Sequence, residues 1–188
     1  MRILQALLEN NNGETVQLLA KNFGLEEQQI ESILSSVVPA MTGNIKQNIS
    51  SESGFQDLVN CFDGHHEEYV ANPTKLAEPE SINEGNAILG HVLGSKEQSR
   101  TLASKAATDT KQDVNIIKQM LPMVANTLMG TLSQETSRSG LLGGMQQGAA
   151  NNQLLGVVTN LLDSDKDGSV WDDLFGMARK IWGQAGKQ

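Results

Sequence analysis

Residues 18–41 read LLAKNFGLEEQQIESILSSVVPAM, and this stretch decides the fold class. Its apolar residues recur at helical spacing on one face, at Ile30, Ile33, Leu34, Val37 and Val38. Gly24 is the type of residue that ends a helix in the left-handed conformation. The stretch therefore predicts a short helix closed by Gly24, followed by a long helix that begins at Glu26 and extends to Ile49.

The same plan returns 83 residues later, without a gap. At this offset the identical pairs include Leu19 with Leu102, Ala20 with Ala103, Gln29 with Gln112, Ile33 with Ile116, and Pro39 with Pro122. Helical periodicity alone would align apolar residues, so the shared proline and the shared Leu-Ala pair carry the specificity. We predict an internal duplication in which each copy is a short helix followed by a long helix that contains proline. Because proline lacks an N–H group, we expect a kink or a break at Pro39.

The rest of the chain divides into segments of different character. Residues 63–83 contain two prolines, many acidic residues and no apolar period, which is typical of a linker. The predicted division is a first helical unit over 1–62, a linker over 63–83, a second helical unit over 84–138 packed on the first, a Gly/Gln-rich connector over 139–152, and a helix–acidic loop–helix over 153–188. Together these segments are expected to form one compact globule.

Composition limits the function classes. The formal net charge is −8, whereas nucleic-acid binding and docking on anionic membranes both need clustered Lys and Arg. Aromatic residues make up only 4% of the chain, so the core must be built from aliphatic residues and Met, which favours an all-α helical bundle. No apolar run approaches about 18 residues, and the N-terminus does not resemble a signal peptide, so the expected location is the cytoplasm.

An acidic loop near the C-terminus is the stretch whose pattern indicates a specific ligand. Residues 163–174 read DSDKDGSVWDDL, with Asp163, Asp165 and Asp167 at alternate positions and Gly168 after the third. Carboxylates at loop positions 1, 3 and 5, a glycine at 6 and an apolar residue at 8 match most of an EF-hand calcium loop. The predicted calcium ligands are Asp163, Asp165, Asp167, the carbonyl of Ser169, and Asp173.

The loop departs from the EF-hand pattern at position 12, where Leu174 replaces the bidentate Glu. Asp173 or Asp172 could close the shell from one or two places earlier, although Asp has a shorter reach than Glu. We therefore expect weak binding, with a dissociation constant of about 10⁻⁴ to 10⁻³ M. The alternative is a plain polar turn in which Asp172 or Asp173 caps the last helix.

Several other residues invite a chemical interpretation but favour a structural one. We expect the run His65, His66, Glu67, Glu68 to be a solvated loop rather than a metal site, because a third ligand at fixed spacing is lacking. We expect His91 to be a packed or surface histidine. Three methionines, Met120, Met123 and Met129, are predicted to be core residues. Three glycines are spaced for close contact between helices, at positions Gly85, Gly90 and Gly94.

Four stretches resemble one family of proteins. They are LLAKNFGLEEQQIESILSSVVPAM (18–41), EGNAILGHVLGS (84–95), IIKQMLPMVANTLMGTL (116–132) and LLDSDKDGSVWDDLFGMA (161–178). They are similar to the YidB-like family of bacterial proteins, which is domain family of unknown function 937. The resemblance implies an all-helical bundle, a bacterial source and an acidic C-terminal tail. It transfers no catalytic residue.

These observations leave three hypotheses. The first is a non-enzymatic interaction or structural module that binds a protein partner and carries a weak calcium loop. The second is an enzyme with a pocket between the two helical units, lined by His91 and acidic neighbours. The third is an envelope- or membrane-associated protein that uses Leu141-Leu142 and a final helix with Phe175 and Trp182. The sequence does not determine the oligomeric state.

Overall fold

The chain folds as a bundle of helices. The computed structural model describes residues 2–49, 51, 54, 57, 58, 65–138 and 156, and these residues contain no β-strand. Their helices are α1 (Arg2–Glu9), η1 (Asn10–Gly13), α2 (Glu14–Phe23), α3 (Glu27–Asn48), α5 (His65–Ala71), η2 (Pro73–Ala77), α6 (Pro79–Leu93), α7 (Lys96–Thr110) and α8 (Val114–Arg138). The predicted all-α fold is confirmed.

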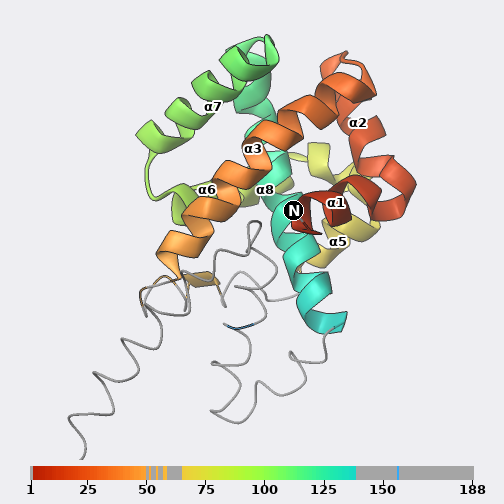
Figure 1. Cartoon of the computed structure of the whole chain (residues 1–188). Coiled ribbons are helices and arrows are strands. Elements are labelled where there is room, and N and C mark those ends of the chain that lie inside the picture. Colours follow the sequence, from red (N-terminus) through yellow and green to blue (C-terminus); the bar gives the residue numbers. More distant parts are fainter. Residues whose placement is uncertain are drawn as a thin grey trace, which may run out of the picture.

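Helix α8 is the centre of the bundle (Figure 1). It contacts α1, α3, α5, α6 and α7, and every residue from 120 to 133 is buried. A helix that is buried all round must satisfy its polar side chains internally. The hydroxyls of Thr127 and Thr131 do so by donating to the carbonyls of Met123 and Thr127, at 2.9 and 2.7 Å. The predicted core methionines are confirmed, since Met120, Met123 and Met129 are all buried.

Both prolines lie inside helices that continue through them. Pro39 lies within α3 and Pro122 within α8, so the break that the sequence analysis allowed does not occur. Buried side chains on both sides of each proline hold the helix in place, for example Val38 and Met41 in α3. The two prolines differ in environment, because Pro39 is exposed and Pro122 is buried.

The order of helices in the second half matches that in the first. Each half has a short helix (α2 or α7) followed by a long helix that contains proline (α3 or α8). The ends of the short helices also correspond in conformation, because Gly24 after α2 and Lys111 after α7 are both left-handed. The match in order fits the predicted duplication, which itself stays a prediction.

The linker expected over residues 63–83 is helical and packed over the residues that the structure describes there. Helix α5, the turn η2 and the first residues of α6 occupy residues 65–83. Val70 and Leu76 are buried, and α5 packs along α8. Gly130 permits this contact, because a Cβ there would lie 2.2 Å from the carbonyl oxygen of His66. A helix this short buries too few apolar residues to show a period, so its sequence is easily mistaken for a linker.

Only one of the three glycines predicted to allow close helix contact does so. A Cβ on Gly85 would lie 2.2 Å from the carbonyl oxygen of Pro122, so α6 and α8 meet backbone to backbone. Gly90 is exposed, and a Cβ there would meet nothing within 4 Å. Gly94 has φ +74° and ends α6, which is a conformation that glycine adopts without strain.

The run of asparagines after α1 is a sharp corner that ties the first helix to later ones. Asn11 and Asn12 are left-handed, with φ of 47° and 56°, a region that Asn tolerates better than most residues. The Asn11 amide donates to the carbonyl of Val70 at 2.7 Å, and the Asn10 amide donates to the Thr131 hydroxyl at 3.1 Å. The corner ends α1 and links it to α5 and α8.

Several predictions concern residues outside those described. These are the connector at 139–152 and the helix–acidic loop–helix at 153–188 apart from Gly156, which is helical. Between α3 and α5, the described residues Gly54, Asp57 and Leu58 are helical.

Candidate functional site

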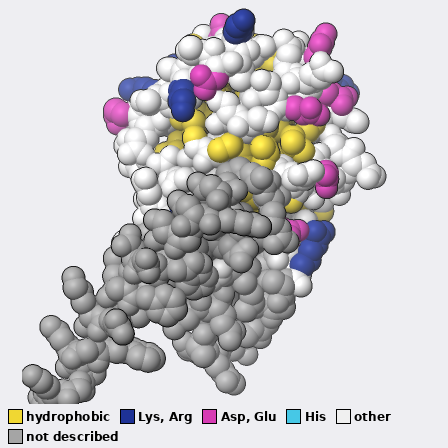
Figure 2. Space-filling model, viewed as in Figure 1, with side chains coloured by type: hydrophobic (Ala, Val, Ile, Leu, Met, Phe, Trp, Pro, Cys, Tyr) yellow, Lys and Arg dark blue, Asp and Glu magenta, His cyan; other side chains and the backbone are white. Residues whose placement is uncertain are grey.

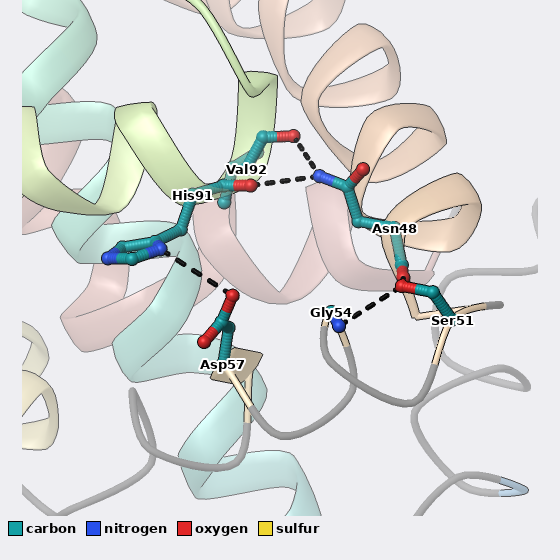
Figure 3. Close-up of polar contacts among 6 residues, drawn as sticks. All are labelled: Asn48, Ser51, Gly54, Asp57, His91 and Val92. Carbon is teal, nitrogen blue, oxygen red and sulfur yellow. Dashed lines mark hydrogen bonds and ion pairs between the residues drawn. The ribbon is translucent and has the colours of Figure 1, made fainter.

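A cavity of about 290 Å³ lies where α3 and α6 end, in the region of Figure 3. Its apolar lining consists of Ile45, Ile49, Leu58, Val92 and Met129. Its polar lining consists of Asn48, Ser51, Asp57 and His91. The cavity therefore joins the first half of the chain to the second and offers an apolar wall beside a polar edge.

Asn48 holds the two helix ends together. Its side-chain amide donates to the carbonyls of His91 and Val92, at 2.8 and 2.9 Å (Figure 3). Carbonyls in the last turn of a helix have no partner within the helix, so this amide satisfies two of them in α6. The sequence gives no sign of this role, because 43 and 44 residues separate the partners.

Ser51 and Gly54 complete the corner below Asn48. The Ser51 hydroxyl donates to the Asn48 carbonyl at 2.9 Å and accepts from the Gly54 N–H at 3.1 Å. A Cβ on Gly54 would lie 2.1 Å from the Asn48 carbonyl oxygen. The corner is thus closely packed, and the Ser51 hydroxyl is engaged as both donor and acceptor.

His91 and Asp57 face each other at the edge of the cavity (Figure 3). The His91 Nδ1 atom lies 3.8 Å from Asp57 Oδ2, and the two side chains are 56% and 51% exposed. This separation is longer than a hydrogen bond, and water competes for the polar atoms of two side chains that are half-exposed. His91 is a surface histidine, as the sequence analysis allowed.

The run from His65 to Glu68 lies on α5 and is not the solvated loop that we expected. His66 is buried, and Glu67 accepts hydrogen bonds from the hydroxyls of Ser133 and Ser137, at 2.6 and 3.1 Å. These contacts fasten α5 to α8, which explains why polar residues occur in a packed helix.

The structure brings no metal-binding group together in the part of the chain that it describes. No cluster of three or more His, Cys, Asp or Glu residues suitable for a metal ion occurs there. The predicted calcium ligands all lie outside the described residues, namely Asp163, Asp165, Asp167, Ser169 and Asp173.

A second polar cluster joins α5 to α6. The Tyr69 hydroxyl donates to Glu84 Oε2 at 2.5 Å. Burial, together with the adjacent Glu84 carboxylate, raises the pKa of Tyr69 to about 12. No sequence pattern reveals this pair, because the Tyr and the Glu are 15 residues apart and belong to no motif.

Tyr69 is the only tyrosine in the chain, so its titration can be followed by tyrosinate absorbance. We expect a midpoint near pH 12 in the folded protein and near pH 10 in urea. Because the fold favours the protonated phenol, its contribution to the free energy of unfolding is fully present below pH 10 and is lost as the pH rises toward 12. In the Tyr69→Phe variant, the free energy of unfolding should not show this decrease between pH 10 and pH 12. A midpoint near pH 10 in the folded protein would contradict the expectation.

The comparison with protein families bears on the whole helical body. A family model described as "Bacterial protein of unknown function (DUF937)" matches residues 5–135. The chain belongs to the DUF937 family. The DUF937 match runs from α1 nearly to the end of α8 and includes the residues around the cavity. It agrees with the resemblance to YidB-like proteins.

The remaining comparisons add no relative to the DUF937 match. No curated protein and no solved structure matches the chain. Among the helices that the structure describes, none combines the length and the apolar character needed to cross a bilayer.

Proposed function

We propose that this DUF937 protein is a non-enzymatic helical interaction or structural module whose C-terminal acidic loop binds calcium weakly. The observation that carries the proposal is the spacing of Asp163, Asp165 and Asp167 ahead of Gly168. Oxygen ligands at this spacing suit a hard cation such as Ca²⁺. The loop follows the family-matched residues 5–135, so the ion would act on an appendage to the helical body.

The geometry of the described residues supports a non-enzymatic role. An enzyme with a nucleophile needs that group within hydrogen-bond reach of a base. At the cavity, the Ser51 hydroxyl is engaged by Asn48 and Gly54, and His91 stands half-exposed at 3.8 Å from Asp57. The alternative, an enzyme, would use the cavity between the two halves. The polar side chain of Asn48 at this cavity instead joins α3 to α6.

The surface of the described part supports an interaction role. Figure 2 shows apolar side chains gathered across the middle of one face, with acidic and basic side chains above them and at the sides. Apolar side chains gathered on one exposed face are typical of a surface that contacts another protein. The third alternative, membrane association through Leu141-Leu142, Phe175 and Trp182, rests on residues outside those described.

Calcium would act as a clamp on the acidic loop. Without a counter-ion, the carboxylates of Asp163, Asp165 and Asp167 repel one another. A bound divalent cation would remove this repulsion and order the loop, together with the helices predicted on each side.

We therefore expect calcium at ten times its dissociation constant to stabilise the protein by about 1.4 kcal/mol. The shift in melting temperature should be a few degrees for a chain of this length. Asp163→Ala with Asp167→Ala should abolish the shift and also the heat of calcium binding in a calorimetric titration. Glu31→Ala with Glu97→Ala removes the same charge from exposed sites and should leave both readouts unchanged. If millimolar calcium produced no heat of binding and no shift in melting temperature, the clamp would be refuted.

A further inference from the structure

We propose that the cavity between α3 and α6 binds a small organic cation, namely an amine that carries an apolar body. This cavity lies in a different part of the chain from the calcium loop and would take a different class of ligand. Its electrostatic field, its apolar wall and its volume support the assignment.

The electrostatic field at the cavity favours a ligand that carries a positive charge. Helix α3 ends at Asn48 and α6 ends at Leu93, and residues from both last turns line the cavity. The C-terminal end of a helix carries roughly half a negative elementary charge. The Asp57 carboxylate adds a full negative charge at the same edge.

The described lining residues contain no Lys or Arg to oppose a cation. His91 can accept a hydrogen bond through a ring nitrogen while it is neutral. The net charge of −8 over the whole chain also raises the concentration of cations near the surface. An ammonium group is therefore favoured over a neutral or anionic group of the same size.

The wall of the cavity selects an apolar body. Ile45, Ile49 and Met129 are buried core residues whose side chains also line the cavity. Gly90 leaves space at the opposite helix, since a Cβ there would meet nothing within 4 Å. A volume of about 290 Å³ is at the small end of the range for small-molecule sites. One ring or one short aliphatic chain beside the ammonium group fits these limits.

Three probes of nearly equal shape test the proposal: benzylammonium, benzyl alcohol and phenylacetate. Binding is followed on the full chain through the ¹³C-methyl signal of Met129, assigned with Met129→Leu. We expect benzylammonium to bind with a dissociation constant of about 1 mM, the strength usual for so small a ligand. The neutral alcohol and the anion should bind at least about fivefold more weakly, since a charge pair near the surface contributes about that factor.

Asp57→Asn should weaken benzylammonium binding about fivefold while leaving the folded spectrum intact. Asp109→Asn makes the same charge change on α7, at an exposed residue away from the cavity, and should leave binding unchanged. Asp163→Ala with Asp167→Ala should also leave it unchanged, which separates this site from the calcium loop. Equal binding of the three probes, no binding of benzylammonium, or no effect of Asp57→Asn would each overturn the proposal.

Discussion

Asn126→Asp is expected to destabilise the bundle severely at pH 7. Asn126 is fully buried in α8, and its amide donates to the carbonyl and the hydroxyl of Ser81, at 2.6 and 2.8 Å. These two hydrogen bonds join the central helix to the first turn of α6. The substitution preserves the shape of the side chain and replaces the donor with a second acceptor.

The cost has two parts. A buried carboxylate loses its hydration, and it faces the carbonyl oxygen of Ser81, which also carries negative charge. An uncompensated buried charge costs about 3–5 kcal/mol, against a total stability of about 5–15 kcal/mol for a typical domain. We therefore expect the variant to lose a large part of its free energy of unfolding in urea denaturation at pH 7.

The effect should depend on pH in a direction that the structure fixes. Burial raises the pKa of the introduced carboxyl in the folded state, so the folded state binds the proton more tightly than the unfolded state. The free energy of unfolding of the variant, relative to the parent protein, should therefore rise as the pH falls from 7 to 5. The protonated group can also donate to Ser81 again.

A control on the same helix separates charge burial from the change of residue. Asn115 is exposed in the first turn of α8, where a negative charge is tolerated or favoured. Asn115→Asp should change stability by less than about 0.5 kcal/mol at either pH. If the two substitutions changed the free energy of unfolding equally, Asn126 could not be buried in contact with Ser81.

Gly85→Ala is expected to destabilise the fold by about 3 kcal/mol, the upper end of the usual cost of overpacking. The new Cβ would lie 2.2 Å from the Pro122 carbonyl oxygen and 2.8 Å from the Pro122 Cα atom. Both atoms belong to the backbone of the buried central helix, so no side chain can rotate out of the way. The only relief is for α6 to move away from α8, which opens the core along their contact.

Gly90→Ala is the matched control, five residues further along α6. A Cβ there would meet nothing within 4 Å, and alanine is a better helix former than glycine by about 0.5–1 kcal/mol. We expect this variant to be slightly more stable than the parent in the same denaturation experiment. Equal effects of the two substitutions would contradict the close contact of α6 and α8.

The long helices could be predicted because local patterns define them. The apolar period of α3 and the glycine that ends α2 are both local signals within the stretch 18–41. This stretch alone is therefore enough to predict the two helices. The same pattern in residues 116–132 identified α8 as helical. It did not show that Pro122 would be buried while Pro39 stays exposed, because that difference depends on the neighbours of each helix.

The predictions over residues 63–83 were wrong because they relied on local pattern alone. Helix α5 has few apolar residues, and its polar residue Glu67 looked like part of a solvated loop. In the structure, Glu67 accepts from Ser133 on α8, and Gly130 lets the two helices approach. Both partners lie more than 60 residues away in the chain.

The cavity was predicted only in outline. A pocket between the two halves, with His91 at its edge, was one of the alternatives, and the structure places a cavity there. The residue that holds it together, Asn48, was not predicted, because its partners are carbonyls at the end of another helix. The acidic loop remains a prediction from sequence.

The sequence by itself determined the helical class, the bounds of α3 to within one residue, and the spacing of the acidic loop. These features depend on backbone hydrogen bonds and apolar periodicity within a few turns, so they can be seen in a short window. Only the tertiary structure decided that α8 is the central helix and that α5 packs on it. It also decided that Asn48 joins the two halves and that Asn126 joins α8 to α6. These features depend on contacts between helices that are distant in sequence. Buried donors such as the Asn126 amide reach their acceptors only when these helices pack together. A glycine such as Gly85 is needed only where the backbone of another helix comes close.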